Sequence, residues 1–339
     1  MTDYKNEKLE NICLKFRFDK IEGQGQDAEP TFILSENKGL LAVYDGLGSA
    51  STEYEYEEEK KASAYWASLF TKQMTEVLFA DNSFNTQNFV AELQEQLKKD
   101  LKEKIKKLEK TPPKFKGNLA NKRLPTTIAG LYFDLTENKL LIFWAGDSRC
   151  YLLNPNGLIQ LTTDDIVTNA DALENLINDA PLSNFVNADT DFVINQYTMS
   201  LEQPCLLITA TDGCFGYLES PAHFEYLMLK NLVNSFNIDH WKADFVNTLK
   251  QIAADDISLS LLAIGYNDFE KMKIDFQNRF IELETKFISP LDDFNRKILD
   301  KETSISVAKN EIEKLKTDKN ELRKTLWEQY KQGYEPKIK

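Results

Sequence analysis

The sequence has 339 residues, of which 42% are hydrophobic, a formal net charge of −13 and four cysteines. This apolar content is enough for a substantial core, and the acidic balance disfavours nucleic acid as a general partner. No run of 18 apolar residues occurs, so no membrane span is predicted, and the first residues lack the pattern of a secretory signal. The cysteines show no Cys-x-x-Cys spacing, which argues against a disulfide framework or zinc site and predicts a cytoplasmic protein.

Three strands are predicted at the start of the chain. Residues 12–18 alternate apolar and polar side chains, and residues 31–34 and 39–44 are short apolar runs. The last run ends in Asp45-Gly46-Leu47-Gly48-Ser49, a turn sequence that leaves one carboxylate at the end of a strand. Its glycines allow another group to approach the backbone closely.

Two helices are predicted next. The first runs from Ser51 to Ala80, capped by Ser51 or Thr52, with five glutamates in residues 53–59 that complement the positive end of the helix dipole. The second runs from about Asn85 to Lys110, with apolar residues at spacings of three and four. The basic stretch over residues 98–123 lacks interleaved aromatics, which favours a solvated face or a dock for an acidic surface over nucleic acid.

The rest of the chain up to residue 266 alternates further strands with two helices. Residues 162–190 are polar with one short helical patch at 166–177, which is typical of a binding loop. Helices are predicted at 221–236 and 241–253. Strands are predicted at 126–134, 139–147, 150–153, 158–161, 191–199, 205–211 and 258–264.

Four of these apolar strands carry an aspartate at one end, namely Asp45, Asp147, Asp212 and Asp255. One such aspartate is explained equally well by a role in a turn or a helix cap. Several of them in one fold favour an oxygen-rich site for a hard divalent cation.

In this order the segments resemble the type-2C metal-dependent Ser/Thr protein phosphatases. The family's Asp-Gly-x-Gly-Gly corresponds to residues 45–49, its Gly-Thr-Thr to Pro125-Thr126-Thr127 and its Gly-Asp-Ser-Arg to residues 146–149. Its Ser-Asp-Gly corresponds to residues 211–213, its Asp-Asn-Ile-Thr to residues 255–258, and its first acidic motif to Gly25-Gln26-Asp27. The resemblance covers about residues 10–266 and is to a divergent, bacterial-like member.

The resemblance implies a role for each matched residue. Asp45 would bridge two Mg²⁺ or Mn²⁺ ions that activate a water, and the Gly46 carbonyl would bind one of them. Asp212 and Asp255 would complete the other coordination shell, Asp27 would add a contact, and Asp147 would serve a weaker third ion. Arg149 is expected to make structural hydrogen bonds rather than to bind phosphate.

The implied fold is α+β, a four-layer α-β-β-α sandwich of two antiparallel sheets flanked by helices. Residues 1–266 would form the phosphatase-like domain, which would hydrolyse phosphoserine and phosphothreonine in phosphoprotein substrates. A second hypothesis stays open, in which the chain is a weak or inactive phosphatase-like module that binds partners. It rests on Pro125 and Ser49, which replace family glycines, and on the lack of an arginine between Phe18 and Asp27.

Residues 267–339 form a charged, helix-prone tail outside the resemblance. Pro290 is expected to divide an earlier helix from a longer one. Apolar residues in the longer helix recur every seven positions, so residues 291–329 are predicted to form a coiled coil with a second copy or a partner helix. The alternative is an α-hairpin folded back on itself or on the phosphatase-like domain. The repeat consists of Leu291, Ile298, Ile305, Ile312 and Leu326, with Phe294, Ala308, Leu315 and Leu322 in the companion positions.

Overall fold

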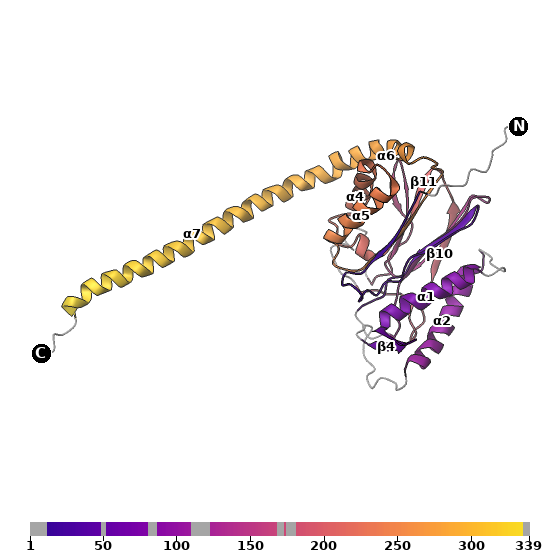
Figure 1. Ribbon diagram of the computed structural model, residues 1–339, viewed down its shortest axis with the longest axis horizontal. Coiled ribbons are helices and arrows are strands. Elements are labelled where there is room, and N and C mark those ends of the chain that lie inside the picture. The colour runs from indigo at the N-terminus through magenta and orange to yellow at the C-terminus, as the bar shows by residue number, and fades with distance from the viewer. Residues whose placement is uncertain are drawn as a thin grey trace. The chain divides into compact units, whose positions relative to one another are not determined.

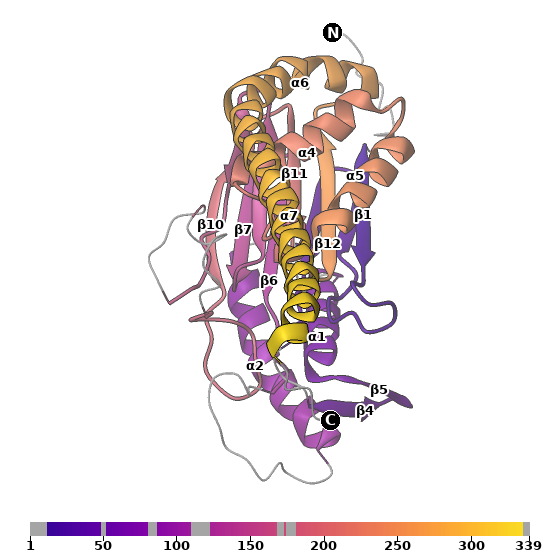
Figure 2. The same ribbon diagram turned by 90° about the vertical axis from the view of Figure 1, so that its left-hand side faces the viewer.

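The computed structural model describes residues 12–48, 52–80, 87–109, 123–167, 173 and 181–334. The chain divides into two compact units, Met1–Leu283 and Glu284–Lys339, which are called the body and the tail below. The boundary expected from the sequence, between residues 266 and 267, lies one helix earlier. Helix α6 (Phe269–Leu283) instead belongs to the body, where it packs along α4 (Pro221–Asn234) (Figure 2). In the described residues no helix is long and apolar enough to cross a membrane.

The body contains two five-stranded sheets in which every neighbouring pair of strands is antiparallel. The first sheet has the order β1 (Cys13–Phe18), β12 (Ile257–Ile264), β11 (Cys205–Ala210), β8 (Arg149–Asn154) and β9 (Gly157–Gln160). The second has the order β10 (Asn195–Ser200), β7 (Lys139–Ala145), β6 (Ile128–Asp134), β3 (Lys38–Val43) and β2 (Thr31–Leu34).

Strand β3 shows how the sheets and helices pack, because its side chains alternate between two cores. Leu41 and Val43 lie between the two sheets, against side chains of the first sheet. Leu40 and Ala42 face the opposite way, into the core under helices α1 (Ser63–Ala80) and α2 (Phe89–Leu108). All four side chains are fully buried, which explains why this strand is a continuous apolar run.

Helices cover the outer face of each sheet. Helices α1 and α2 lie on one side of the sheet pair, and α4 and α5 (Ile238–Ile252) lie on the other (Figure 1). Phe245 of α5 packs edge to face on Phe16 of β1, and Phe224 of α4 contacts Tyr151 of β8. The expected α+β four-layer sandwich is therefore confirmed.

The predicted helix over residues 51–80 is wrong in its first part. Residues Glu53–Tyr56 and Glu59–Ala62 form a hairpin, β4 and β5, and the helix begins at Ser63. Tyr54 is buried between solvated glutamates, which is the two-residue period of a strand. Glu57 and Glu58 make the turn with positive φ angles of 50° and 70°. The glutamates are therefore hairpin residues and do not complement a helix dipole.

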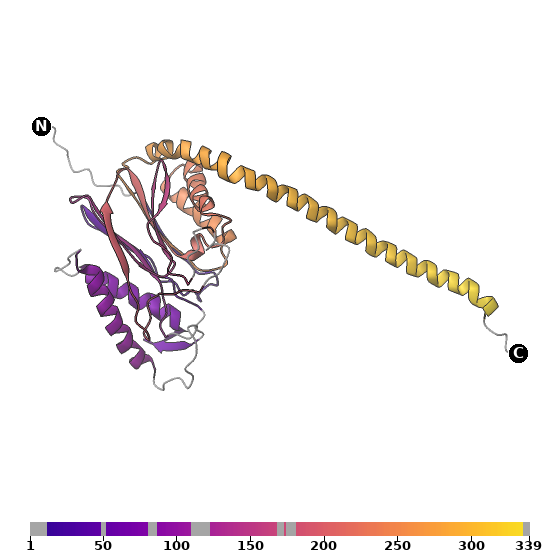
Figure 3. The same cartoon turned by 180° about the vertical axis from the view of Figure 1, so that it is seen from behind.

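The other elements of the body agree with the sequence to within a few residues. Most of the helical patch expected at 166–177 lies outside the described residues, as does Ser51. The tail consists of a short π-helical segment, Glu284–Ile288, and helix α7, Ser289–Tyr334, with Pro290 in its first turn. Helix α7 runs for 46 residues without interruption (Figure 3), so its residues 291–329 do not form a hairpin with each other.

Candidate functional site

Asp45 directly follows β3 and Tyr44, and two threonines hold its backbone. The Thr126 hydroxyl and the Thr127 N–H both donate to the Asp45 carbonyl oxygen, at 2.6 and 2.8 Å. The Asp45 N–H donates to the Thr127 hydroxyl oxygen at 3.2 Å. The segment Pro125-Thr126-Thr127 therefore fixes the backbone from which the Asp45 carboxylate projects.

At two positions of the motifs only glycine fits, because a carbonyl group from another part of the backbone lies against it. A Cβ on Gly46 would lie 2.4 Å from the Gln26 carbonyl oxygen, and a Cβ on Gly213 would lie 1.8 Å from the Asp256 carbonyl oxygen. Both distances are too short for any side chain. These glycines bring the loop before Asp27 against Asp45, and the turn after Asp212 against residues 255–256.

Asp256 was not predicted to be a site residue, yet its side chain links the segment before β12 to the loop that follows β1. Its carboxylate accepts hydrogen bonds from the N–H groups of Lys20 at 2.8 Å and Gln26 at 2.6 Å. The next residue, Asp27, is 2% exposed and accepts a hydrogen bond from the Thr211 hydroxyl at 3.1 Å. Asp256 thus positions the loop that carries Asp27 beside the strand ends that carry Asp212 and Asp255.

The aspartates at these strand ends are close enough to disturb one another's protonation. Burial raises the pKa of Asp45 well above its usual range, and the charges of Asp27, Asp212, Asp147 and Asp255 raise it further. The structure therefore brings together all five aspartates that the sequence indicated.

Three of the remaining carboxyl groups, those of Asp27, Asp147 and Asp255, are shifted in the same direction. Burial, followed by the charge of Asp212, raises the pKa of Asp147 to about 8 and that of Asp255 to about 6. Burial also raises the pKa of Asp27 to about 7, against the hydrogen bond from the Thr211 hydroxyl that lowers it, and the charges of Asp256 and Asp212 add to the rise. Such like-charge crowding is typical of functional sites.

The aspartates meet at a cavity of about 300 Å³, whose wall includes Asp45, Gly46, Asp212 and Asp255. Asp27 and Asp147 do not line it, but Asp147 has a buried carboxylate oxygen without a hydrogen-bond partner. In the described part of the chain, no three carboxylate, imidazole or thiol groups are already arranged to hold a metal ion. Mg²⁺ keeps several waters in its shell, so such a site needs only one or two direct carboxylate ligands. The oxygen-only donor set fits a hard divalent cation.

Arg149 lies in the same turn as Asp147 but is fully engaged. Its guanidinium makes two hydrogen bonds to the Asp164 carboxylate, at 2.9 and 2.6 Å, and stacks on the Phe215 ring at 4.2 Å. The structural hydrogen bonds expected of Arg149 are therefore present. Asp165, which follows Asp164 in the chain, accepts hydrogen bonds from the Gly146 N–H and from the Asn184 and Asn195 side chains. It therefore anchors the Gly146-Asp147 turn.

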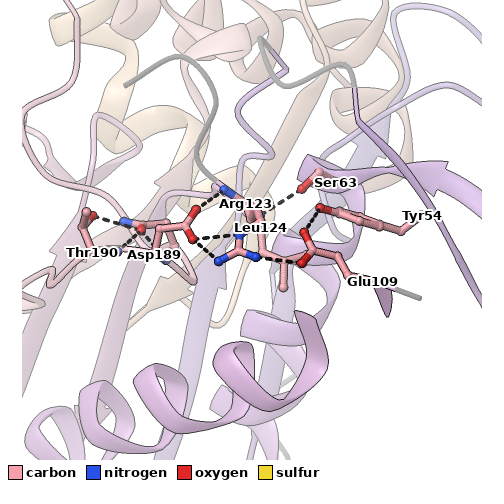
Figure 4. A network of polar contacts seen from close by, with 8 residues as sticks. Tyr54, Ser63, Glu109, Arg123, Leu124, Asp189 and Thr190 are labelled. Atoms are coloured by element: carbon pink, nitrogen blue, oxygen red, sulfur yellow. Dashed lines mark hydrogen bonds and ion pairs between the residues drawn. The ribbon is translucent and has the colours of Figure 1, made fainter. Parts of the chain in front are cut away.

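A second group of charged residues, the Arg123 network, lies just before Pro125 (Figure 4). Arg123 donates to the Asp189 carboxylate at 2.8 Å and to the Glu109 carboxylate at 2.8 Å. Glu109 also accepts a hydrogen bond from the Tyr54 hydroxyl at 3.2 Å. In this network every charge faces an opposite charge, and its contacts join α2, β4 and the chain after residue 186 to the segment that holds Asp45.

The two-sheet fold with carboxylates at one end is compatible with a hydrolase of the metal-dependent class, and comparison with known proteins identifies the family. The Protein phosphatase 2C family model matches residues 23–251, more than half of the chain, so this chain belongs to that family. A curated Mycoplasma genitalium protein named "Putative protein phosphatase" is 29% identical over 141 residues, which cover 38% of this chain. The match spans about half, 52%, of that relative's length.

Solved structures agree with this fold. A bacterial serine phosphatase is 18% identical with a TM-score of 0.56, over 76% of this chain and 98% of that one. The serine/threonine phosphatase Stp1 from Staphylococcus aureus is also 18% identical with a TM-score of 0.56, over 77% of this chain and 96% of that one. At this level of identity the likeness establishes the fold.

Proposed function

We propose that this chain is a metal-dependent phosphatase that removes phosphate from phosphoserine and phosphothreonine in proteins. The observation that carries the proposal is the convergence of Asp45, Asp212 and Asp255, from distant parts of the chain, on one cavity, with Asp27 and Asp147 close enough to raise the pKa of Asp45. Membership of the Protein phosphatase 2C family supports the reaction class. We further infer that the protein works in the cytoplasm.

The proposed ligands are those expected from the family motifs. Asp45 would bridge two Mg²⁺ or Mn²⁺ ions, the Gly46 carbonyl would bind one, and Asp212 and Asp255 would hold the other. A third ion would be held more weakly at Asp147, and Asp27 would be a further contact in the centre. The burial of Asp45 and Asp147 and the unpaired oxygen of Asp147 support this assignment, because a cation would relieve both.

When bound, such cations supply Lewis acidity, which polarises phosphoryl oxygens and lowers the pKa of water. The chain's own contribution is positional. Thr126 and Thr127 fix the Asp45 backbone, and Asp256 fixes the loop that leads to Asp27. Little side-chain rearrangement is then needed during the reaction, which is the main advantage of a preorganised polar site.

The alternative of an inactive binding module is not favoured by the site. The substitutions Pro125 and Ser49 leave the carboxylates in place, and Pro125 still precedes the two threonines that hold Asp45. A chain that had lost catalysis would be under no constraint to keep five crowded carboxylates, whose mutual repulsion costs stability without a cation.

The test measures phosphate release from a phosphothreonine peptide and from an aryl phosphate, with Mn²⁺, with Mg²⁺ and with a chelator. The proposed function expects turnover that depends on the cation and disappears with the chelator. Turnover that persists in the chelator would contradict the metal mechanism. Cation binding by calorimetry without turnover of several phosphopeptides would favour the binding module.

A further inference from the structure

Helix α7 of the tail carries an apolar stripe from Leu291 to Leu326, interrupted by Lys301 and Lys319. The large side chains of this stripe are between 40 and 66% exposed. Within the tail, α7 is the one α-helix among the described residues, so the tail itself provides no second helix to cover the stripe. The stripe consists of Leu291, Phe294, Ile298, Ile305, Ile312, Leu315, Leu322 and Leu326.

The side chains of the stripe indicate how many helices would pack together. With Leu291 as position a of a heptad, isoleucine occupies a at 298, 305 and 312, and leucine occupies d at 315 and 322. β-Branched residues at a with leucine at d favour two parallel strands. Lys319 occupies the next a position, and Lys301 occupies the d position between Phe294 and Ala308. A polar residue in the seam fixes register and helix number at a cost in stability.

The flanking charges distinguish between orientations. In a parallel, in-register pair, each g residue faces the e residue five positions later on the other helix. Three such pairs are then of opposite charge and none is of like charge: Lys297 with Glu302, Glu311 with Lys316, and Asp318 with Arg323. In the antiparallel alignment of the same heptads, Lys309 would face Lys316. Lys316 contacts Glu313 in the single helix, but both are well exposed, so this pair is weak and is easily exchanged.

We propose that α7 pairs with α7 of a second copy of this chain to form a parallel, in-register, two-stranded coiled coil over residues 291–329. The occupant is a second copy because the helix is complementary to itself in both its stripe and its flanking charges. This pairing does not depend on phosphatase activity.

The first test is the mass of the full chain in solution. Sedimentation should give a dimer of about 78 kDa, twice the 39.0 kDa chain. Ile305→Asp with Ile312→Asp should give a monomer, because the charges fall in the apolar seam. Thr303→Asp with Thr317→Asp, on the opposite side of the same helix, is the matched control and should remain dimeric. A monomeric wild-type chain would overturn the proposal, and it would favour a tail that folds onto the body.

The second test addresses orientation through charge. Lys316→Glu should weaken the dimer about tenfold, because two attractive pairs become repulsive. Adding Glu311→Lys should restore the affinity, since the pair is then reversed on both helices. The double variant has no such rescue in antiparallel pairing, where residues 311 and 316 do not face each other. A double variant as weak as Lys316→Glu alone would overturn the parallel arrangement.

The third test is a cross-link in the seam. Lys319→Cys should form an intermolecular disulfide under mild oxidation, because the a positions of a parallel pair face each other. Lys314→Cys, on the outer side of the helix, is the control and should not. A dimer that gives no cross-link at residue 319 would show a different register or orientation.

Discussion

The body contains two clusters of charged residues that are built in opposite ways. The aspartate pocket gathers charges of one sign, and each carboxylate raises the pKa of its neighbours. The Arg123 network alternates signs, with Arg123 between the carboxylates of Asp189 and Glu109. Both are partly buried, and both lie next to the segment 125–127.

This difference distinguishes a ligand-binding site from a network of ion pairs that stabilises the fold. Charges that satisfy each other contribute to stability and have no need of a further partner. Charges that repel each other reduce the stability of the free protein, and they persist where a ligand of opposite charge compensates them. Substitutions in the aspartate pocket should therefore change chemistry, and substitutions in the Arg123 network should change stability.

The largest expected effect is that of Asp45→Asn. We expect kcat/KM for a phosphopeptide to fall by about 100- to 1,000-fold, because the residue that would bridge the cations loses its charge. In the presence of chelator, the Tm of the variant should be no lower than that of the wild type, because one of the repelling charges has been removed. Asp134→Asn, the same change at a buried aspartate outside the pocket, is the control and should keep its activity. Wild-type activity of the Asp45→Asn variant would contradict the assignment of Asp45 as a cation ligand.

Cation binding should stabilise the pocket itself. At about 100 times its dissociation constant, Mn²⁺ stabilises a protein that binds it only when folded by about 2.7 kcal/mol. For a body of this size that is a rise in Tm of about 5 °C or more, measured by calorimetry. The rise should shrink in Asp45→Asn. An equal rise in Tm for the wild type and for Asp45→Asn would show that the cation binds at another site.

Arg123→Ala should lower stability with little effect on chemistry. The substitution removes the cation that both the Glu109 and the Asp189 carboxylates contact, which we expect to cost about 2 kcal/mol of unfolding free energy. Lys60→Ala, which removes the exposed pair with Glu53, is the comparison and should leave the unfolding free energy almost unchanged. The measurement is chemical denaturation, with kcat of the folded enzyme beside it. A large loss of kcat at full stability would place Arg123 in the site instead.

The smallest expected effect is a pH dependence at Asp134, another compensated charge. Burial alone would raise its pKa, but the Lys38 ammonium and the N–H groups of Glu137 and Thr136 lower it overall. A lowered pKa stabilises the fold above the ordinary value of 3.8, and this contribution is lost as the pH falls below it.

Asp134→Asn keeps an oxygen for the backbone donors and loses the Lys38 pair, at a cost of about 1 kcal/mol near neutral pH. The difference in unfolding free energy between wild type and variant should shrink between pH 6 and pH 3. A difference that stays constant over this range would show that the charge of Asp134 contributes nothing.

Local patterns predicted most of the sandwich, because buried strands such as β3 are apolar runs that end in clear turn sequences. The hairpin β4–β5 was missed because its glutamates resemble the first turn of a helix. The two tyrosines at every second position were the one local signal of a strand.

The site was predicted as a set of residues but not as a geometry. Asp45, Asp147 and Asp212 follow strands and Asp255 precedes one, so these four could be recognised one by one. The family resemblance grouped them and added Asp27. The supporting contacts have no local signature, because Asp256 reaches Lys20 across 236 residues and Arg123 reaches Asp189 across 66. Such pairings depend on how the two sheets pack, and no window of the sequence contains both partners.

Helix α7 has a consequence for the handling of substrates. Its 46 residues make a rod of about 69 Å at 1.5 Å per residue. In the proposed parallel pair, both bodies are joined to the same end of one rod. Each dimer would therefore hold two of the proposed phosphatase sites tethered near each other. A protein with two phosphorylated residues that engages the first site then meets the second at an effective concentration on the order of millimolar. Clustered phosphosites would therefore be cleared in one encounter, whereas isolated ones would gain nothing from the tail.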